Sequence, residues 1–134
     1  MACSACSSPT IVCSVPETYR EFAPAESSVA TLCTRCLTVE SAASEATDGD
    51  ADPDFSRVSD AFPSDHETAV ALALAVDLCS SLATNRAAIE TLLEAVERVG
   101  TDPLLAIDRL ASDPDLEPAI DLDRRRHQLE QLLY

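Results

Sequence analysis

Residues 33–36, Cys33-Thr34-Arg35-Cys36, repeat the cysteine spacing of Cys3-Ser4-Ala5-Cys6, and 26 residues separate the two pairs. Each C-x-x-C pair supplies two thiolates from one tight turn, so two such turns together provide the four ligands of a tetrahedral zinc ion. A unit of about forty residues buries little apolar area, and metal binding supplies folding free energy on the order of 10 kcal/mol. The spacing therefore predicts one structural zinc in a zinc ribbon, bound by Cys3, Cys6, Cys33 and Cys36.

Two alternatives for these pairs stay open, a rubredoxin-like iron site and a thiol redox pair. Four thiolate ligands leave no coordination position for water, so a zinc here is structural and not catalytic. Ser7 and Leu37 follow the two pairs, where glycine commonly supplies a permissive backbone, which predicts imperfect knuckle geometry. The other two cysteines, Cys13 and Cys79, lie in apolar surroundings, and we interpret them as small buried residues.

The sequence of residues 1–40 predicts a small β-rich ribbon. Thr10 to Val15 and Leu37 to Val39 favour strands flanking the two cysteine turns. Between them, Pro24 followed by residues 25–32 predicts one or two helical turns, because proline is tolerated in the first turn of a helix. Residues 41–53 have no large apolar side chain and many acids, which predicts a flexible acidic linker.

Residues 54–134 have the periodicity of a helical bundle, so the predicted fold class is α+β, with a zinc ribbon, a linker and a mainly helical region. Asp52-Pro53 begins a short helix that ends before Pro63 and carries three apolar residues on one face, Phe55, Val58 and Phe62. Residues 64–67, Ser-Asp-His-Glu, fit a capping box with Ser64 as the N-cap. The body of the helix that follows, residues 69–82, is apolar on nearly all sides, as expected of a central core helix.

The remaining helices are amphipathic. Arg86 to Val99 ends at Gly100 and places five apolar residues inside, Ile89, Leu92, Leu93, Val96 and Val99. Whether this helix continues the preceding one, as a single long helix, stays open. Asp102-Pro103 begins another helix, which Asp113-Pro114 ends. A last helix over about 121–133 carries an apolar stripe that predicts docking on the bundle, Leu122, Leu129, Leu132 and Leu133.

The charge balance of the chain limits its possible partners and indicates the environment in which it works. The chain has 134 residues, with 24 Asp and Glu against nine Arg, no Lys, and a formal net charge of -15. This balance disfavours non-specific binding to nucleic-acid phosphates or anionic lipids. Arginine in place of lysine, heavy acid use and abundant alanine indicate a halophilic host; the alternative is an ordinary acidic or partly disordered protein. No run approaches 18 apolar residues and the first twenty residues do not resemble a secretory signal, so we expect a cytoplasmic chain that binds no membrane.

Little else in the sequence points to catalysis. Two glycines are too few for a Gly-rich phosphate loop, and no sequence pattern makes a second metal ligand or a nucleophile converge on His66 or His127. The basic cluster Arg124-Arg125-Arg126 is surrounded by acids, and we expect Arg126 to pair with Glu130 at i,i+4.

The chain resembles uncharacterised haloarchaeal proteins of a domain-of-unknown-function type, with an N-terminal zinc ribbon and a helical remainder. The stretches that carry the resemblance are Leu32-Cys33-Thr34-Arg35-Cys36-Leu37, 52–63, 85–90, 102–110, 121–126 and 128–133. The first knuckle departs from the Cys-Pro-x-Cys-Gly form of such ribbons at Ser4 and Ser7. The resemblance implies zinc and halophily, but no activity.

These observations favour a non-enzymatic interaction protein, in which the ribbon and the helical region contact another protein. One alternative is a nucleic-acid-associated regulator that uses Arg35 and the cluster 124–126. The other is a redox protein that uses one C-x-x-C pair as a reversible disulfide.

Overall fold

The fold is built on a central strand, β2 (Val29–Cys33), whose five residues are all buried. The computed structural model describes residues 2–42 and 53–133. In this part of the chain β2 pairs antiparallel with β1 (Thr10–Ser14) on one side and with β3 (Val39–Ser41) on the other, in the order β1-β2-β3. The predicted α+β fold class is confirmed: a three-stranded antiparallel sheet with the cysteine cluster precedes a helical region.

The predicted helical turns over residues 25–32 are wrong for most of that stretch. Only a 3-10 turn, η2 (Pro24–Glu26), forms after another 3-10 segment, η1 (Glu17–Phe22), and β2 begins at Val29. Residues 29–33 face neighbours on both sides of the sheet, and a short apolar run of this kind fits a fully buried strand as well as a helix. Pairing with β1 and β3 decides between the two.

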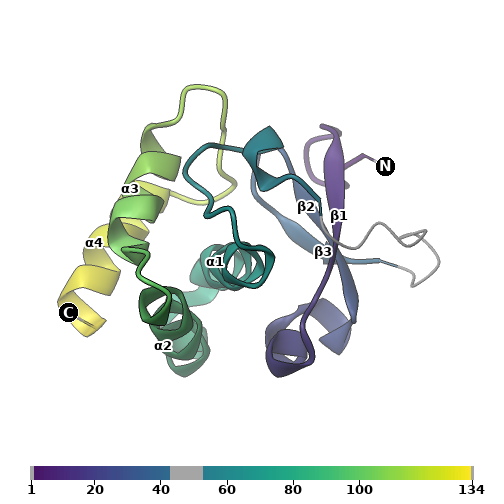
Figure 1. Ribbon diagram of the computed structural model, residues 1–134. Helices are drawn as coiled ribbons and strands as arrows, with labels where there is room; N and C mark the ends of the chain where they lie inside the picture. The colour runs from purple at the N-terminus through teal and green to yellow at the C-terminus, as the bar shows by residue number, and fades with distance from the viewer. Residues whose placement is uncertain (1, 43–52, 134) are drawn as a thin grey trace.

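Helix α1 (His66–Leu78) lies between the sheet and the other helices (Figure 1). Residues 68–76 are buried without a break, which confirms the predicted central core helix. The remaining helical segments of the described chain are η4 (Phe55–Arg57), η5 (Cys79–Ser81), α2 (Leu82–Arg98), α3 (Pro103–Ser112) and α4 (Leu122–Leu133). One cluster of buried side chains runs from the sheet through α1 into α2, α3 and α4.

The junction of α1 and α2 answers the open question of helix continuity. The 3-10 turn η5 separates the two helices, and the backbone of Ser81 (φ -134°, ψ 68°) is not helical. Asn85 Nδ2 donates to the carbonyl of Leu78 at 3.1 Å across this corner. The helices α1 and α2 therefore pack against each other rather than forming one straight rod.

By length and composition alone, the segment His66–Arg98 can cross a membrane, since its most apolar 18-residue window has a mean hydropathy of 1.4. Of that window, 61% is buried inside the protein. Burial of this kind is typical of a core helix, which passes the same test of length and composition.

Helix ends follow the expected chemistry with local differences. Asp65, not the predicted Ser64, is the N-cap of α1, because its side chain accepts from the Thr68 N–H at 3.1 Å. Asp102 caps α3 in the same way, and Gly100 has the left-handed φ of 91° that ends a helix. The predicted short helix before Pro63 is reduced to the turn η4.

Most of the expected apolar residues are buried, but Val99 and Leu132 are exposed and Leu133 is half-buried. Phe55, Val58 and Phe62 are buried although their helix is not formed. Val99 is 61% exposed instead of inside, because it lies in the turn after α2, and Leu132 on α4 is 43% exposed. Of the predicted linker 41–53, residues 43–52 lie outside the described chain, and the division into 1–40, 41–53 and 54–134 stays a prediction.

Candidate metal centre

The four predicted ligands come together at one end of the sheet. Cys33 is the last residue of β2, and Cys3 precedes β1 beside an isolated bridge between Ala2 and Pro9. The Sγ atoms of Cys3, Cys6, Cys33 and Cys36 all lie within 4.8 Å of one another. Sulfurs of different knuckles approach closely, at 3.4 Å for Cys6 to Cys33 and 3.6 Å for Cys3 to Cys36.

The two knuckles have the same backbone geometry. The N–H of Cys3 donates to the carbonyl of Ser8 at 2.8 Å, and the N–H of Cys33 donates to the carbonyl of Thr38 at 3.0 Å, five residues on in each case. Ser7 (φ 64°) and Leu37 (φ 65°) take the left-handed conformation where glycine is usual. The predicted imperfection therefore takes the form of backbone strain at two matching positions.

Backbone N–H groups point at the sulfurs within each turn. Ala5 N donates to Cys3 Sγ at 3.3 Å, and the N–H groups of Arg35 and Cys36 both donate to Cys33 Sγ at 3.4 Å. Such donors favour the thiolate, which is the form that binds a metal.

The thiols differ in their surroundings. Burial raises the pKa of Cys33 to about 12 and also raises the pKa of Cys36, whereas hydrogen bonds from Ser8 and then Cys33 lower the pKa of the exposed Cys6 to about 6. A bound cation reverses such increases, because it stabilises every thiolate it contacts.

The donor set and its dimensions fit a tetrahedral metal ion. Zn–S bonds of about 2.3 Å place tetrahedral sulfur ligands ~3.8 Å apart, and the separations here lie on either side of that value. Cys3, Cys33 and Cys36 are buried and Cys6 is exposed. The four clustered cysteines can bind a metal ion such as zinc, and four thiolate ligands leave no open position for substrate.

Distant segments support both knuckles. Ser4 in the first knuckle is held by Glu40 of β3. At the second knuckle, the carbonyls of Arg35 and Cys36 accept from the N–H groups of Glu117 and Ala119 at 2.8 and 3.1 Å. These supports were not predicted, since the contacts span 36 to 83 residues and no sequence pattern links their members.

The other predicted candidates lie elsewhere. Cys13 and Cys79 are 5% and 1% exposed, which confirms both as buried residues, and burial raises their pKa values to about 11 and 12. His66 Nε2 lies 3.0 Å from the carbonyl oxygen of Ser14, and Nδ1 of the exposed His127 lies 3.0 Å from the carbonyl oxygen of Asp123, one turn earlier in the same helix.

One arginine of the basic cluster, Arg126, pairs with acids of α3 and α4. The predicted pair of Arg126 and Glu130 is confirmed at 3.3 Å, and the same guanidinium lies 3.3 Å from Asp108 and 3.8 Å from Asp123. Arg35 forms an exposed ion pair with Glu117 at 2.6 Å.

No curated protein and no solved structure matches the chain. A family model does match it, over residues 2–133, which include all four clustered cysteines and every described helix and strand. The chain therefore belongs to DUF6276, a family of unknown function.

Proposed function

We propose that this protein is a non-catalytic interaction protein of a halophilic cytoplasm, in which one structural zinc ion holds the two cysteine knuckles together. The observation that carries the proposal is the cluster of four thiols, three of them buried, with all Sγ atoms within 4.8 Å. Zinc supplies two positive charges to this cluster and stabilises the four thiolates at once. The zinc then contributes folding free energy and takes no part in a reaction.

The arrangement of the sulfurs supports a metal site over a redox dithiol. A redox C-x-x-C pair reacts within one turn, whereas here sulfurs of different turns approach to 3.4 Å, for Cys6 and Cys33, and to 3.6 Å, for Cys3 and Cys36. Tetrahedral coordination brings all four sulfurs to comparable distances, as found here.

The charges support a protein partner over a nucleic acid. Arg35 and Arg126 already pair with carboxylates, and the chain as a whole has a formal net charge of -15. Zinc binding by four thiolates makes the formal charge two units more negative. Non-specific nucleic-acid binding requires cations that contact phosphates, and a chain with this charge balance repels them.

The first test is the metal content per chain by elemental analysis, on protein made without a metal-binding tag and purified in molar KCl. We expect about one zinc per chain, and Cys33→Ser to lose it. Cys13→Ala is the matched control: Cys13 is also a buried cysteine of the sheet, but it lies outside the cluster, so this variant should keep the metal. Metal-free wild-type protein with a reversible disulfide would overturn the zinc assignment in favour of the redox alternative.

The second test concerns the partner. Crosslinking in cell extract at molar salt, followed by mass spectrometry, should give a specific protein that the zinc-free Cys33→Ser variant fails to capture. Salt-resistant binding to nucleic acid that is lost in an Arg124→Gln/Arg125→Gln variant would instead support the regulator.

A further inference from the structure

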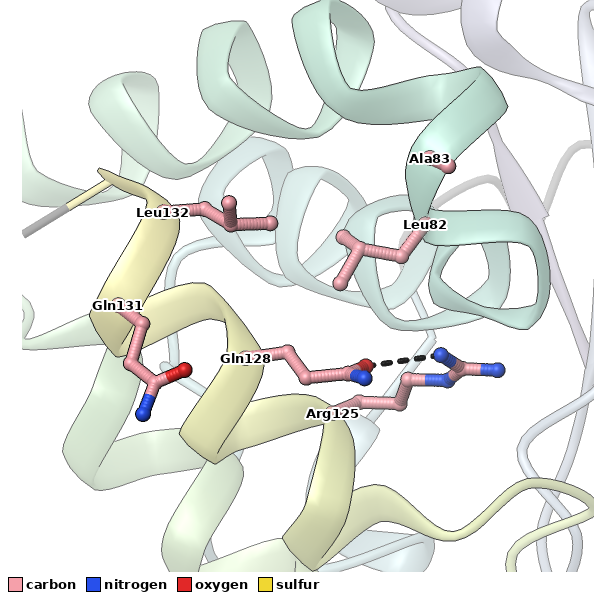
Figure 2. Close-up of a pocket in the computed structure, with 6 residues that line it drawn as sticks. All are labelled: Leu82, Ala83, Arg125, Gln128, Gln131 and Leu132. Atoms are coloured by element: carbon pink, nitrogen blue, oxygen red, sulfur yellow. Dashed lines mark hydrogen bonds between the residues drawn. The ribbon is translucent and has the colours of Figure 1, made fainter.

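A groove lies on the opposite side of α1 from the sheet, between α4 and the first turn of α2. It has a volume of about 330 Å³ and is lined by Leu82, Ala83, Arg125, Gln128, Gln131 and Leu132 (Figure 2). Arg86 holds its two walls together, because its guanidinium donates to the carbonyl of Leu132 at 3.0 Å. The groove shares no residue with the cysteine cluster and is therefore a separate site.

One part of the groove is apolar. Figure 2 shows the side chains of Leu82 and Leu132 pointing toward each other from the two helices. Leu132 is 43% exposed, whereas Leu122 and Leu129 of the same helix are 3% and 0% exposed. The exposed leucine therefore leaves apolar surface in the groove that a ligand can cover.

The other part of the groove carries a single charge, that of Arg125. The lining contains no carboxylate, although the chain has 24 acidic residues. Within residues 2–42 and 53–133, no carboxylate forms an ion pair with Arg125, whereas the next residue, Arg126, contacts three.

A hydrogen bond to Gln128 holds the Arg125 guanidinium in one orientation. Its Nη1 donates to Gln128 Oε1 at 2.8 Å, and the two side chains lie alongside each other below the leucines (Figure 2). This contact uses the oxygen of Gln128 and leaves its Nε2 group as a further donor. A carboxylate placed here can accept from both residues.

We propose that this groove binds an aliphatic monocarboxylate, a free acid with an unbranched hydrocarbon chain. Its carboxylate would accept from Arg125, and its chain would lie between Leu82 and Leu132. The volume is near the lower end of small-ligand sites, about 300–1,000 Å³, so a short acid matches it better than a long one. The same chemistry occurs at a peptide C-terminus that ends in leucine, and the test separates the two sources.

The test is a titration of the ¹⁵N-labelled full chain followed by NMR chemical shifts, with octanoate, octanamide, acetate and N-acetyl-leucine as probes. We expect octanoate to shift the amide signals of the first turn of α2 and of α4 from Arg125 to Leu132, and to bind more tightly than the other three. Arg125→Gln should weaken octanoate binding by about tenfold or more, because a charge-assisted hydrogen bond is lost.

Arg124→Gln is the matched control, because it removes the same charge from the exposed neighbour, which does not line the groove. Octanoate should bind this variant within twofold of wild type, and circular dichroism should show both variants folded. Equal effects of the two substitutions, equal binding of octanamide, or no octanoate binding would overturn the proposal. Tighter binding of N-acetyl-leucine than of octanoate would overturn the free acid in favour of a peptide C-terminus.

Discussion

Glu40 of β3 holds Ser4 of the first knuckle through both of its carboxylate oxygens. Oε2 accepts from the Ser4 hydroxyl at 2.7 Å and Oε1 accepts from the Ser4 backbone N–H at 3.2 Å. These bonds lower the pKa of Glu40, so the carboxylate is ionised when it binds the knuckle. A proline at position 4, as in the usual ribbon form, has neither a hydroxyl nor an N–H and can make neither bond.

Glu40→Ala should therefore weaken zinc binding, by about tenfold, because the turn that presents Cys3 and Cys6 loses its anchor. Glu40→Gln keeps one acceptor oxygen and should lose less. Competition with a chromophoric chelator measures both affinities, and Glu90→Ala, which removes an exposed glutamate from α2, is the control. An affinity for Glu40→Ala equal to that of the control would show that the anchor has no part in metal binding.

Ser7 and Leu37 have matching φ angles, but we expect glycine to stabilise the protein at position 7 and to destabilise it at position 37. A left-handed backbone costs a residue with a Cβ roughly 1–2 kcal/mol. Substitution by glycine removes this cost, but it also raises the entropy of the unfolded chain, which cancels part of the gain in stability. Ser7 is exposed, so Ser7→Gly should stabilise the zinc-loaded protein by about 0.5–1 kcal/mol.

Leu37 is 3% exposed, so Leu37→Gly removes a packed side chain as well and should destabilise by about 2–4 kcal/mol. Denaturant unfolding gives both free energies. A destabilising Ser7→Gly would mean that the strain at this position is not relieved by glycine.

Hydrogen bonds join the second knuckle to the α3–α4 connector, residues 113–121. We therefore expect metal removal to loosen this connector, although it lies about 80 residues further along the chain. The amides of Glu117 and Ala119 donate to carbonyls of Arg35 and Cys36, and we expect a zinc ion bound by Cys33 and Cys36 to keep these carbonyls in place. Chelation should speed hydrogen exchange of the peptide that contains both amides by about tenfold or more, as expected for local opening.

Exchange in the peptide that covers Leu92 and Leu93, two fully buried residues of α2, is the internal control and should change less. Unchanged protection of the connector after chelation would show that its bonds do not depend on the metal.

Asp77 predicts a pH dependence of stability. Its Oδ1 accepts from the Val39 N–H at 3.1 Å, and burial, together with the charge of Glu40, raises its pKa above the ordinary value of 3.8. The folded state therefore binds this proton more tightly than the unfolded state does. The free energy of unfolding therefore falls as the pH rises from 3.8 through the raised pKa of folded Asp77. Above that pKa the loss of stability caused by ionised Asp77 is complete.

Asp77→Asn keeps an acceptor for Val39 without the charge, so it should be more stable than wild type at neutral pH. Its advantage should shrink as the pH falls toward 3.8 and vanish below that pH. Urea unfolding of both proteins at each pH measures the difference, in which effects common to both proteins cancel. A less stable Asn variant at neutral pH would contradict the argument.

Local patterns in the sequence were enough to predict the four α-helices and the cysteine set, but not the short helical segments before them. The Asp102-Pro103 start, the Gly100 stop and the apolar run over residues 69–76 depend on neighbours in the chain, which a sequence displays directly. The two C-x-x-C pairs identified four thiols that the fold brings together, because each pair by its spacing presents two metal ligands from one turn.

Only the tertiary structure decided that residues 29–33 form a strand and that Glu40 and Glu117 support the knuckles. It also decided that Arg125 lines a partly apolar groove, where no carboxylate of residues 2–42 and 53–133 pairs with it. The strand assignment depends on partners on both sides, since a short apolar run suits a buried helix or a buried strand equally well. The other two depend on contacts between segments 36 to 83 residues apart or on different helices. Such contacts are set by packing in three dimensions, which no local pattern encodes.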